Sequence, residues 1–275
     1  MNKQATESRR GPWVRVLVPA LGALALAAGC GMPADDDQDV EIATGAIMGG
    51  GNAIAGNFPW QARIIIYEPT KTENCGGTLI TKNWVVTAAH CVDGDAVASS
   101  TFMWLGDHDT SISEGYEQPA FVSEIHLHPT ADVALLKLVN PVALNARIAP
   151  IKIATGSDSS GTGIASGWGQ TGPDESQQSS TILQRALLPI RSASTCNNAL
   201  QLPRDLRNDE LCAGYSTGSP GTCHGDSGGP FVLKRSNGTF ELVGVTSWGG
   251  LICESYSVFS KVSASASWIN GLAVN

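Results

Sequence analysis

The sequence has no surplus of positive charge. Its 275 residues include 17 lysines and arginines against 25 aspartates and glutamates, which gives a formal net charge of -8 and a pI of about 5.0. Domains that bind nucleic acid concentrate basic side chains on one face, whereas residues 47–275 contain no basic cluster. We therefore exclude nucleic acid as a partner, and the acidic balance favours solubility.

Long apolar runs and long helical patterns are also missing. After Cys30, no apolar run approaches the roughly 20 residues that cross a bilayer, so we expect a soluble mature domain. Short apolar segments bounded by Gly, Pro, Asn and Ser predict β-strands instead. The expected strands cover residues 61–67, 77–81, 84–87, 133–139, 163–166, 182–190, 230–233 and 241–247. Residues 264–272 alone predict a helix, because their apolar side chains recur at helical spacing.

No Cys-x-x-Cys pair occurs, and no histidine lies at zinc-finger spacing, which argues against a structural zinc site. The sequence nevertheless contains seven cysteines: Cys30, Cys75, Cys91, Cys196, Cys212, Cys223 and Cys253. An odd number leaves one cysteine without a partner if the others pair. The N-terminal position of Cys30 makes it the candidate for a different role.

The first 28 residues have the layout of a secretory signal. Basic residues at positions 3, 9, 10 and 15 precede an apolar segment at 16–28, and the string LAAGC ends at Cys30. This string resembles the lipobox of bacterial lipoproteins, whose cysteine is lipidated. We expect a signal peptide at 1–29, lipidation and membrane attachment at Cys30, and a protein secreted or lipid-anchored at a bacterial cell envelope. The alternative is an ordinary signal peptide cleaved near Ala28. The acidic residues 30–46 have little to bury and predict a linker and propeptide.

The string GDSGGP at 225–230 surrounds Ser227 with small residues, as expected of a nucleophile that must approach its substrate closely. A serine hydroxyl needs an imidazole to take its proton and a carboxylate to orient that imidazole. The strings TAAHC at 87–91 and DVALL at 132–136 supply His90 and Asp132. An esterase with an α/β-hydrolase fold also contains Gly-x-Ser-x-Gly, but its acid and histidine follow the serine. The order His90, Asp132, Ser227 and the absence of alternating helices argue against the esterase.

These three motifs, in this order, resemble those of the trypsin and chymotrypsin family, and the resemblance extends over nearly all of residues 47–275. It implies an all-β fold of two packed six-stranded antiparallel β-barrels with a C-terminal helix. It also implies a serine endopeptidase that acts on proteins or peptides through an acyl-enzyme and requires no cofactor. We expect a monomer. A non-catalytic relative that uses the same fold for binding or adhesion is the alternative.

The resemblance assigns roles to individual residues. Ser227 is the expected nucleophile, His90 the base, and Asp132 the residue that holds the histidine tautomer. The backbone N–H groups of Gly225 and Ser227 are expected to form the oxyanion hole. The implied disulfides are Cys75 with Cys91, Cys196 with Cys212, and Cys223 with Cys253, which indicate an oxidising compartment.

The family resemblance also implies a zymogen. In relatives, cleavage before a sequence such as Ile47-Met48-Gly49-Gly50 frees an ammonium group that pairs with the aspartate at the position of Asp226. The residue before the cut is Ala46 rather than Arg or Lys, so we expect cleavage by an enzyme that prefers small residues.

Two binding sites are expected from the same resemblance. The primary specificity pocket would be formed by Gly221, Thr222, Ser247, Trp248, Gly249 and Ser257. Gly221 occupies the place of the aspartate of trypsin-like members, so we expect cleavage after uncharged residues, apolar or small. The second site is a calcium loop, in which the carboxylates of Asp107, Glu114 and Glu117 and the carbonyls of Asp109 and Ile112 would offer oxygen ligands. The alternative is an acidic, solvated loop.

Overall fold

The computed structural model describes residues 50–94, 96–156, 158–172, 178–200, 205–216, 220–249, 253 and 255–273, all within one compact unit that spans residues 41–275. Ile47 and Cys30 lie outside the described residues, as does the whole predicted signal peptide.

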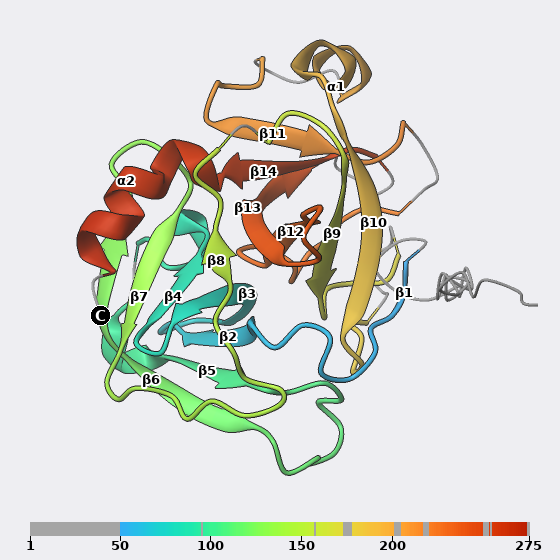
Figure 1. Ribbon diagram of the computed structural model, residues 1–275. Helices are drawn as coiled ribbons and strands as arrows, with labels where there is room; N and C mark the ends of the chain where they lie inside the picture. Colours follow the sequence, from blue (N-terminus) through green and yellow to red (C-terminus); the bar gives the residue numbers. More distant parts are fainter. Residues whose placement is uncertain are drawn as a thin grey trace, which may run out of the picture. The chain divides into compact units, whose positions relative to one another are not determined.

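The first half of this unit forms a closed antiparallel barrel in the order β2-β3-β4-β7-β6-β5 (Figure 1). Its strands are β2 (Gln61–Tyr67), β3 (Thr72–Thr81), β4 (Trp84–Thr87), β5 (Thr101–Leu105), β6 (Gln118–Leu127) and β7 (Ala134–Leu138). Two short 3-10 turns, η1 (Ala89–Cys91) and η2 (Ala98–Ser100), lie between β4 and β5. Alternating burial along β2, with Ile64 and Ile66 facing inward, is the pattern of a barrel wall.

The second half closes in the same way through the ring β9-β10-β11-β14-β13-β12, because β9 pairs with both β10 and β12. These strands are β9 (Thr162–Gly167), β10 (Gln184–Arg191), β11 (Glu210–Ala213), β12 (Pro230–Lys234), β13 (Phe240–Gly249) and β14 (Ser257–Lys261). Two short strands, β1 (Gly51–Asn52) and β8 (Lys152–Ile153), extend this sheet beside β10 and β13. The predicted fold of two six-stranded barrels is therefore confirmed.

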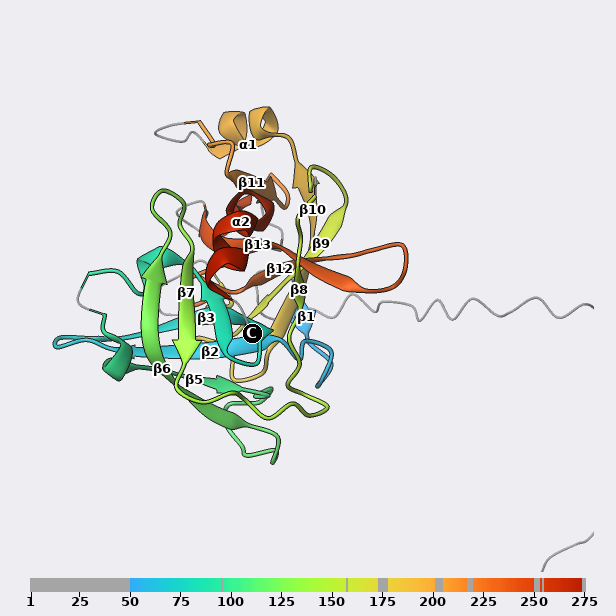
Figure 2. The ribbon, with the colours of Figure 1, turned by 60° about the vertical axis from the view of Figure 1, so that its left-hand side comes forward.

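Two α-helices accompany the strands in the described part of the chain. Helix α1 (Ala193–Leu200) precedes β11, and helix α2 (Val262–Leu272) ends the described chain, as the predicted C-terminal helix does. Val262 and Ile269 of α2 join the core of the first barrel, and Figure 2 shows this helix in front of the strands. Neither helix of the described residues has the length and apolar character that a membrane crossing requires.

The sequence patterns missed several strands. The expected segments 61–67 and 84–87 coincide with β2 and β4, whereas β5, β6, β11 and β14 were not predicted. β6 contains Pro119 and two exposed polar residues, Ser123 and Glu124, and its pairing with β5 and β7 makes it a strand. Such pairing is a tertiary effect that local propensity does not show.

Candidate active site

His90 is positioned by the end of strand β4. The chain leaves β4 at Thr87, passes through extended Ala88 and enters the 3-10 turn η1, which places the His90 side chain at the surface with about 42% of its area exposed. The disulfide between Cys91 and Cys75 ties this turn to strand β3. A histidine at the end of a buried strand, fixed by a covalent bond one residue away, has little freedom to move.

Asp132 holds His90 through two hydrogen bonds. The backbone N–H of His90 donates to Asp132 Oδ1 at 2.9 Å, and His90 Nδ1 lies 2.8 Å from Asp132 Oδ2. Because Nδ1 faces a carboxylate, it carries the proton, and Nε2 is left to accept one. This is the tautomer that a general base requires.

Two serines of the second barrel hold Asp132. Ser247 Oγ donates to Asp132 Oδ2 at 2.5 Å, and Ser260 Oγ donates to the Asp132 carbonyl oxygen at 2.8 Å. The family resemblance implied a place in the specificity pocket for Ser247, and no sequence pattern pointed to Ser260. The aspartate and its histidine come from the first barrel, so these contacts place the pair at the junction of the two barrels.

The charges of this pair are coupled. The hydrogen bond to Asp132 raises the pKa of His90 above its ordinary value, although burial opposes the change. For Asp132, burial raises the pKa, but hydrogen bonds from His90 and Ser247 outweigh it, and the pKa falls below its ordinary value. Asp132 is thus a carboxylate at neutral pH, and it stabilises a positive charge on His90.

Ser227 lies beside the first barrel because the backbone at Gly228 packs closely against strands β3 and β4. Gly228 has a φ of 78° and lies against β4: a Cβ at this position would be 2.1 Å from Thr87 Oγ1 and 2.5 Å from the Gly76 carbonyl oxygen. The Gly76 N–H donates to the Ser227 carbonyl oxygen at 2.7 Å. Only glycine fits there, and this contact brings Ser227 beside the segment that leads to His90. Within the described part of the chain, no hydrogen bond joins Ser227 Oγ to His90, as is common before a substrate binds.

The backbone before Ser227 is bent around Asp226. Gly225 has a φ of 93°, and the Asp226 N–H donates to the Cys223 carbonyl oxygen at 3.0 Å. Within the described residues, the N–H groups of Gly225 and Ser227 donate no hydrogen bond. They are the two groups that sequence analysis assigned to the oxyanion hole, and both remain available to a substrate.

The Asp226 side chain is buried, with 1% of its area exposed. Its Oδ1 accepts from the Gly169 N–H and its Oδ2 from the Cys223 N–H, each at 2.9 Å. Burial raises the pKa of Asp226 to about 6 against these two donors. No lysine, arginine or histidine of the described chain forms an ion pair with it. A carboxylate in this setting is complementary to a cation.

The expected specificity residues gather around Gly221. A Cβ on Gly221 would lie 3.0 Å from the Ser255 carbonyl oxygen and 3.1 Å from that of Cys253. The Thr222 N–H donates to Ser257 Oγ at 2.9 Å, and Ser257 is buried. At the end of β13, Trp248 is partly exposed and Gly249 is exposed. This arrangement places the carbonyl oxygens of Cys253 and Ser255 and the hydroxyl of Ser257 beside Gly221, at the expected base of the pocket.

The described residues contain three disulfides: Cys75–Cys91, Cys196–Cys212 and Cys223–Cys253. They are the pairs that the family resemblance implies. The third joins the segment before Ser227 to the segment before β14, and so links the two walls of the expected specificity pocket.

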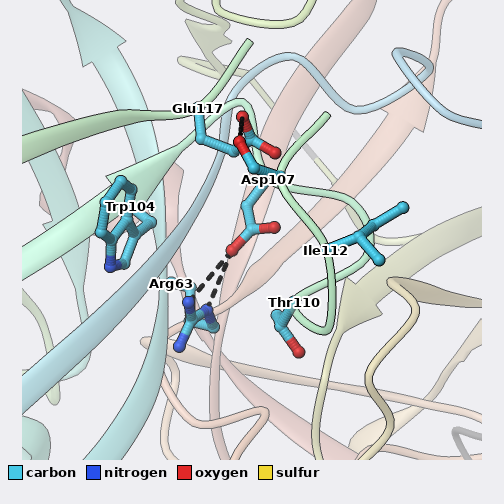
Figure 3. A pocket seen from close by; sticks show the side chains of 7 residues that line it. Arg63, Trp104, Asp107, Thr110, Ile112 and Glu117 are labelled. Atoms are coloured by element: carbon cyan, nitrogen blue, oxygen red, sulfur yellow. Dashed lines mark hydrogen bonds and ion pairs between the residues drawn. The ribbon is translucent and has the colours of Figure 1, made fainter. Parts of the chain in front are cut away.

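The residues of the expected calcium loop do not fit a calcium ion. Asp107 forms an ion pair with Arg63 at 3.0 Å (Figure 3), and Glu114 forms one with Arg147 at 2.7 Å. Glu117 instead accepts hydrogen bonds from the backbone of Gly115 and Tyr116, and Asp109 accepts from Ser111. The described residues contain no cluster of three or more metal-ligating side chains. Arginines therefore already balance two of the carboxylates that were expected to bind calcium.

Residues 47–269 match the family model described as Trypsin. Relatives include clotting factor C of Tachypleus tridentatus (34% identical over 81% of this chain), ovochymase of Halocynthia roretzi (35% over 81%) and trypsin-1 of Astacus astacus (33% over 83%). The matched region spans 25% of clotting factor C and 15% of ovochymase, but 100% of trypsin-1. The family match and the full coverage of trypsin-1 show that the chain belongs to the trypsin family of serine-type endopeptidases.

Proposed function

We propose that this chain hydrolyses peptide bonds through Ser227, His90 and Asp132. The observation that carries the proposal is the double hydrogen bond between Asp132 and His90, at a point where the Ser227 backbone is bonded to strand β3. This juxtaposition has the order of donors and acceptors that nucleophilic catalysis by serine needs.

In the proposed reaction, Ser227 Oγ attacks the carbonyl carbon of the substrate while its proton passes to His90 Nε2. The carbonyl oxygen becomes an oxyanion and accepts hydrogen bonds from the N–H groups of Gly225 and Ser227. His90 then gives the proton to the leaving amine as the C–N bond breaks, which leaves an acyl-enzyme. Water, activated by His90, hydrolyses this ester and restores Ser227.

The proposed preference is for an uncharged residue, apolar or small, before the scissile bond. It is supported by Gly221, which offers no charge at the position where trypsin-like members hold an aspartate. An arginine or lysine side chain would find no carboxylate among the described residues of this pocket.

Activation is proposed to follow cleavage after Ala46. The freed ammonium of Ile47 would pair with Asp226, whose buried carboxylate has no cationic partner in the described chain. Formation of this ion pair would order the neighbouring Gly225 and Ser227. Finding Ile47 still joined to Ala46 in fully active protein would contradict this proposal.

Export is part of the same proposal, with signal peptide, linker and catalytic domain at 1–29, 30–46 and 47–275, and with Cys30 as a lipid-bearing residue. Because the three disulfides use the other six cysteines, none of them ties Cys30 to the catalytic domain. Cleavage before Ile47 would then release that domain from the membrane. Active enzyme that stays membrane-bound after this cleavage would refute the release.

The experiment is cleavage of a diverse peptide mixture, analysed by mass spectrometry beside a Ser227→Ala variant. Cuts after uncharged residues that disappear in the variant would support the peptidase and its preference. If the processed protein, with Ile47 verified as its first residue, makes no cuts, the binding-protein alternative is favoured.

A further inference from the structure

A cavity of about 160 Å³ borders the expected oxyanion hole. Gly225 and the disulfide-bonded Cys75 line it, together with the side chains of Arg63, Asn74, Thr110 and Ser179. None of the expected specificity-pocket residues contributes to it. A substrate whose acyl part occupied that pocket would therefore bring the residues after its scissile bond towards this cavity.

Arg63, on strand β2, is the charged side chain that lines the cavity. Its Nε and Nη2 both donate to a single oxygen of Asp107, at 3.3 and 3.0 Å. Asp107 lines a neighbouring cavity, shown in Figure 3, and does not line this one. Within the described residues Arg63 Nη1 donates no hydrogen bond, and the side chain is 23% exposed against 5% for Asp107. The guanidinium thus keeps donors that the internal ion pair does not use.

The other polar side chains that line the cavity, among the described residues, are uncharged. Asn74, Thr110 and Ser179 make no side-chain hydrogen bond with the described part of the chain, and no carboxylate of that part lines the cavity. A planar guanidinium beside free amide and hydroxyl groups is suited to a carboxylate, because arginine binds this group through charge-assisted, often bidentate hydrogen bonds.

We propose that this cavity binds an acidic side chain of the substrate on the leaving-group side of the scissile bond, with Arg63 as the residue that determines this specificity. The inference rests on the proposed peptidase function. Asp107 holds Arg63 in place from the other side, which orients the guanidinium before the substrate arrives.

The test uses quenched fluorescent peptides with one common acyl side and with Glu, Gln or Lys at each position after the scissile bond. The processed enzyme is expected to cleave the best Glu peptide with a kcat/KM about tenfold above its Gln counterpart, as a partly exposed charge-assisted hydrogen bond would give. In Arg63→Gln this Glu/Gln ratio should fall to about one. A chromogenic anilide substrate, which has no residues after the scissile bond, reports the peptidase activity itself.

Arg147→Gln is the matched control, because Arg147 is also partly buried and paired with a carboxylate but lines neither cavity. Its Glu/Gln ratio should stay at the wild-type value. If Arg63→Gln loses stability, the double variant Arg63→Gln/Asp107→Asn replaces the ion pair by two amides. The Glu/Gln ratio is then measured with this double variant. A wild-type enzyme that hydrolyses the anilide but shows no Glu preference, or a ratio unchanged in the Arg63 variants, would overturn the inference. Absence of all hydrolysis would instead contradict the proposed function.

Discussion

The hydroxyl of Ser247 donates a 2.5 Å hydrogen bond to the same Asp132 oxygen that faces His90 Nδ1. The two donors come from different barrels, β13 in one case and the turn after β4 in the other. This shared oxygen couples the packing of the barrels to the electrostatics of the expected catalytic pair.

Ser247→Ala is expected to lower kcat by about tenfold, the effect of losing one hydrogen bond to a charged group. The remaining charge on Asp132 would interact more strongly with His90, so the acidic limb of the kcat/KM profile should move to higher pH. Steady-state kinetics across pH measure both effects. Ser260→Ala, which removes a bond only to the Asp132 backbone, should leave the limb in place; an equal shift in both variants would argue against this account.

Activity should depend on the charge of His90. Protonated His90 cannot accept the proton of Ser227, so activity is present above the pKa of His90 and is lost as the pH falls through it. Asp132 raises this pKa above its ordinary value of 6.5. In Asp132→Asn, kcat should fall by about 10⁴-fold, and the residual activity should have its acidic limb at lower pH. If the acidic limb of the variant's pH profile lies at the same pH as that of the wild type, Asp132 is not the cause of the raised His90 pKa.

Asp226 predicts a pH dependence of stability in the uncleaved chain. Its pKa in the folded state, about 6, lies above the ordinary 3.8, so the folded state binds the proton more tightly. The free energy of unfolding should therefore rise as the pH falls, by about 1 kcal/mol between pH 7 and 5. Urea unfolding of the wild type and of Asp226→Asn at both pH values isolates this contribution. The difference between the two proteins in free energy of unfolding should change by about 1 kcal/mol between pH 7 and 5.

Cleavage before Ile47 should reverse this trend. An ammonium beside Asp226 would lower the pKa of the carboxyl, and the stability gained would be present at neutral pH and lost as the pH falls through the new pKa. Urea unfolding of the wild type and of Asp226→Asn, both cleaved before Ile47, measures this change. An unchanged pH dependence would contradict the proposed ion pair.

His128 is expected to position the loop that carries Asp132. Its Nδ1 accepts hydrogen bonds from the N–H groups of Thr130 and Ala131, at 3.2 and 2.9 Å, and its ring packs on Trp268 of α2. His128→Ala should lower kcat about tenfold through the loss of these bonds, with a smaller change in KM. His128→Asn keeps an oxygen acceptor and should recover part of the activity; if both variants behave alike, packing on Trp268 rather than the acceptor is responsible.

Calcium removal should have no effect on stability. The ion pairs of Asp107 with Arg63 and of Glu114 with Arg147 already neutralise two of the three carboxylates of the expected calcium loop. The midpoint of thermal unfolding should be the same in a chelator and in millimolar calcium, with millimolar magnesium as the control for ionic strength. A midpoint raised by calcium alone would restore the calcium site.

The sequence by itself determined the family, the barrel class and the candidates His90, Asp132 and Ser227, because three short motifs in one order carry that information locally. It also pointed to the six cysteines that pair. Only the tertiary structure decided that strands β11 and β14 form, since they pair with each other although they lie far apart in the chain. It likewise placed Ser247 on Asp132 and Arg63 on Asp107. Hydrogen bonds and ion pairs between residues 44 or 115 positions apart depend on how the barrels close and pack, and no local pattern of residues encodes that geometry.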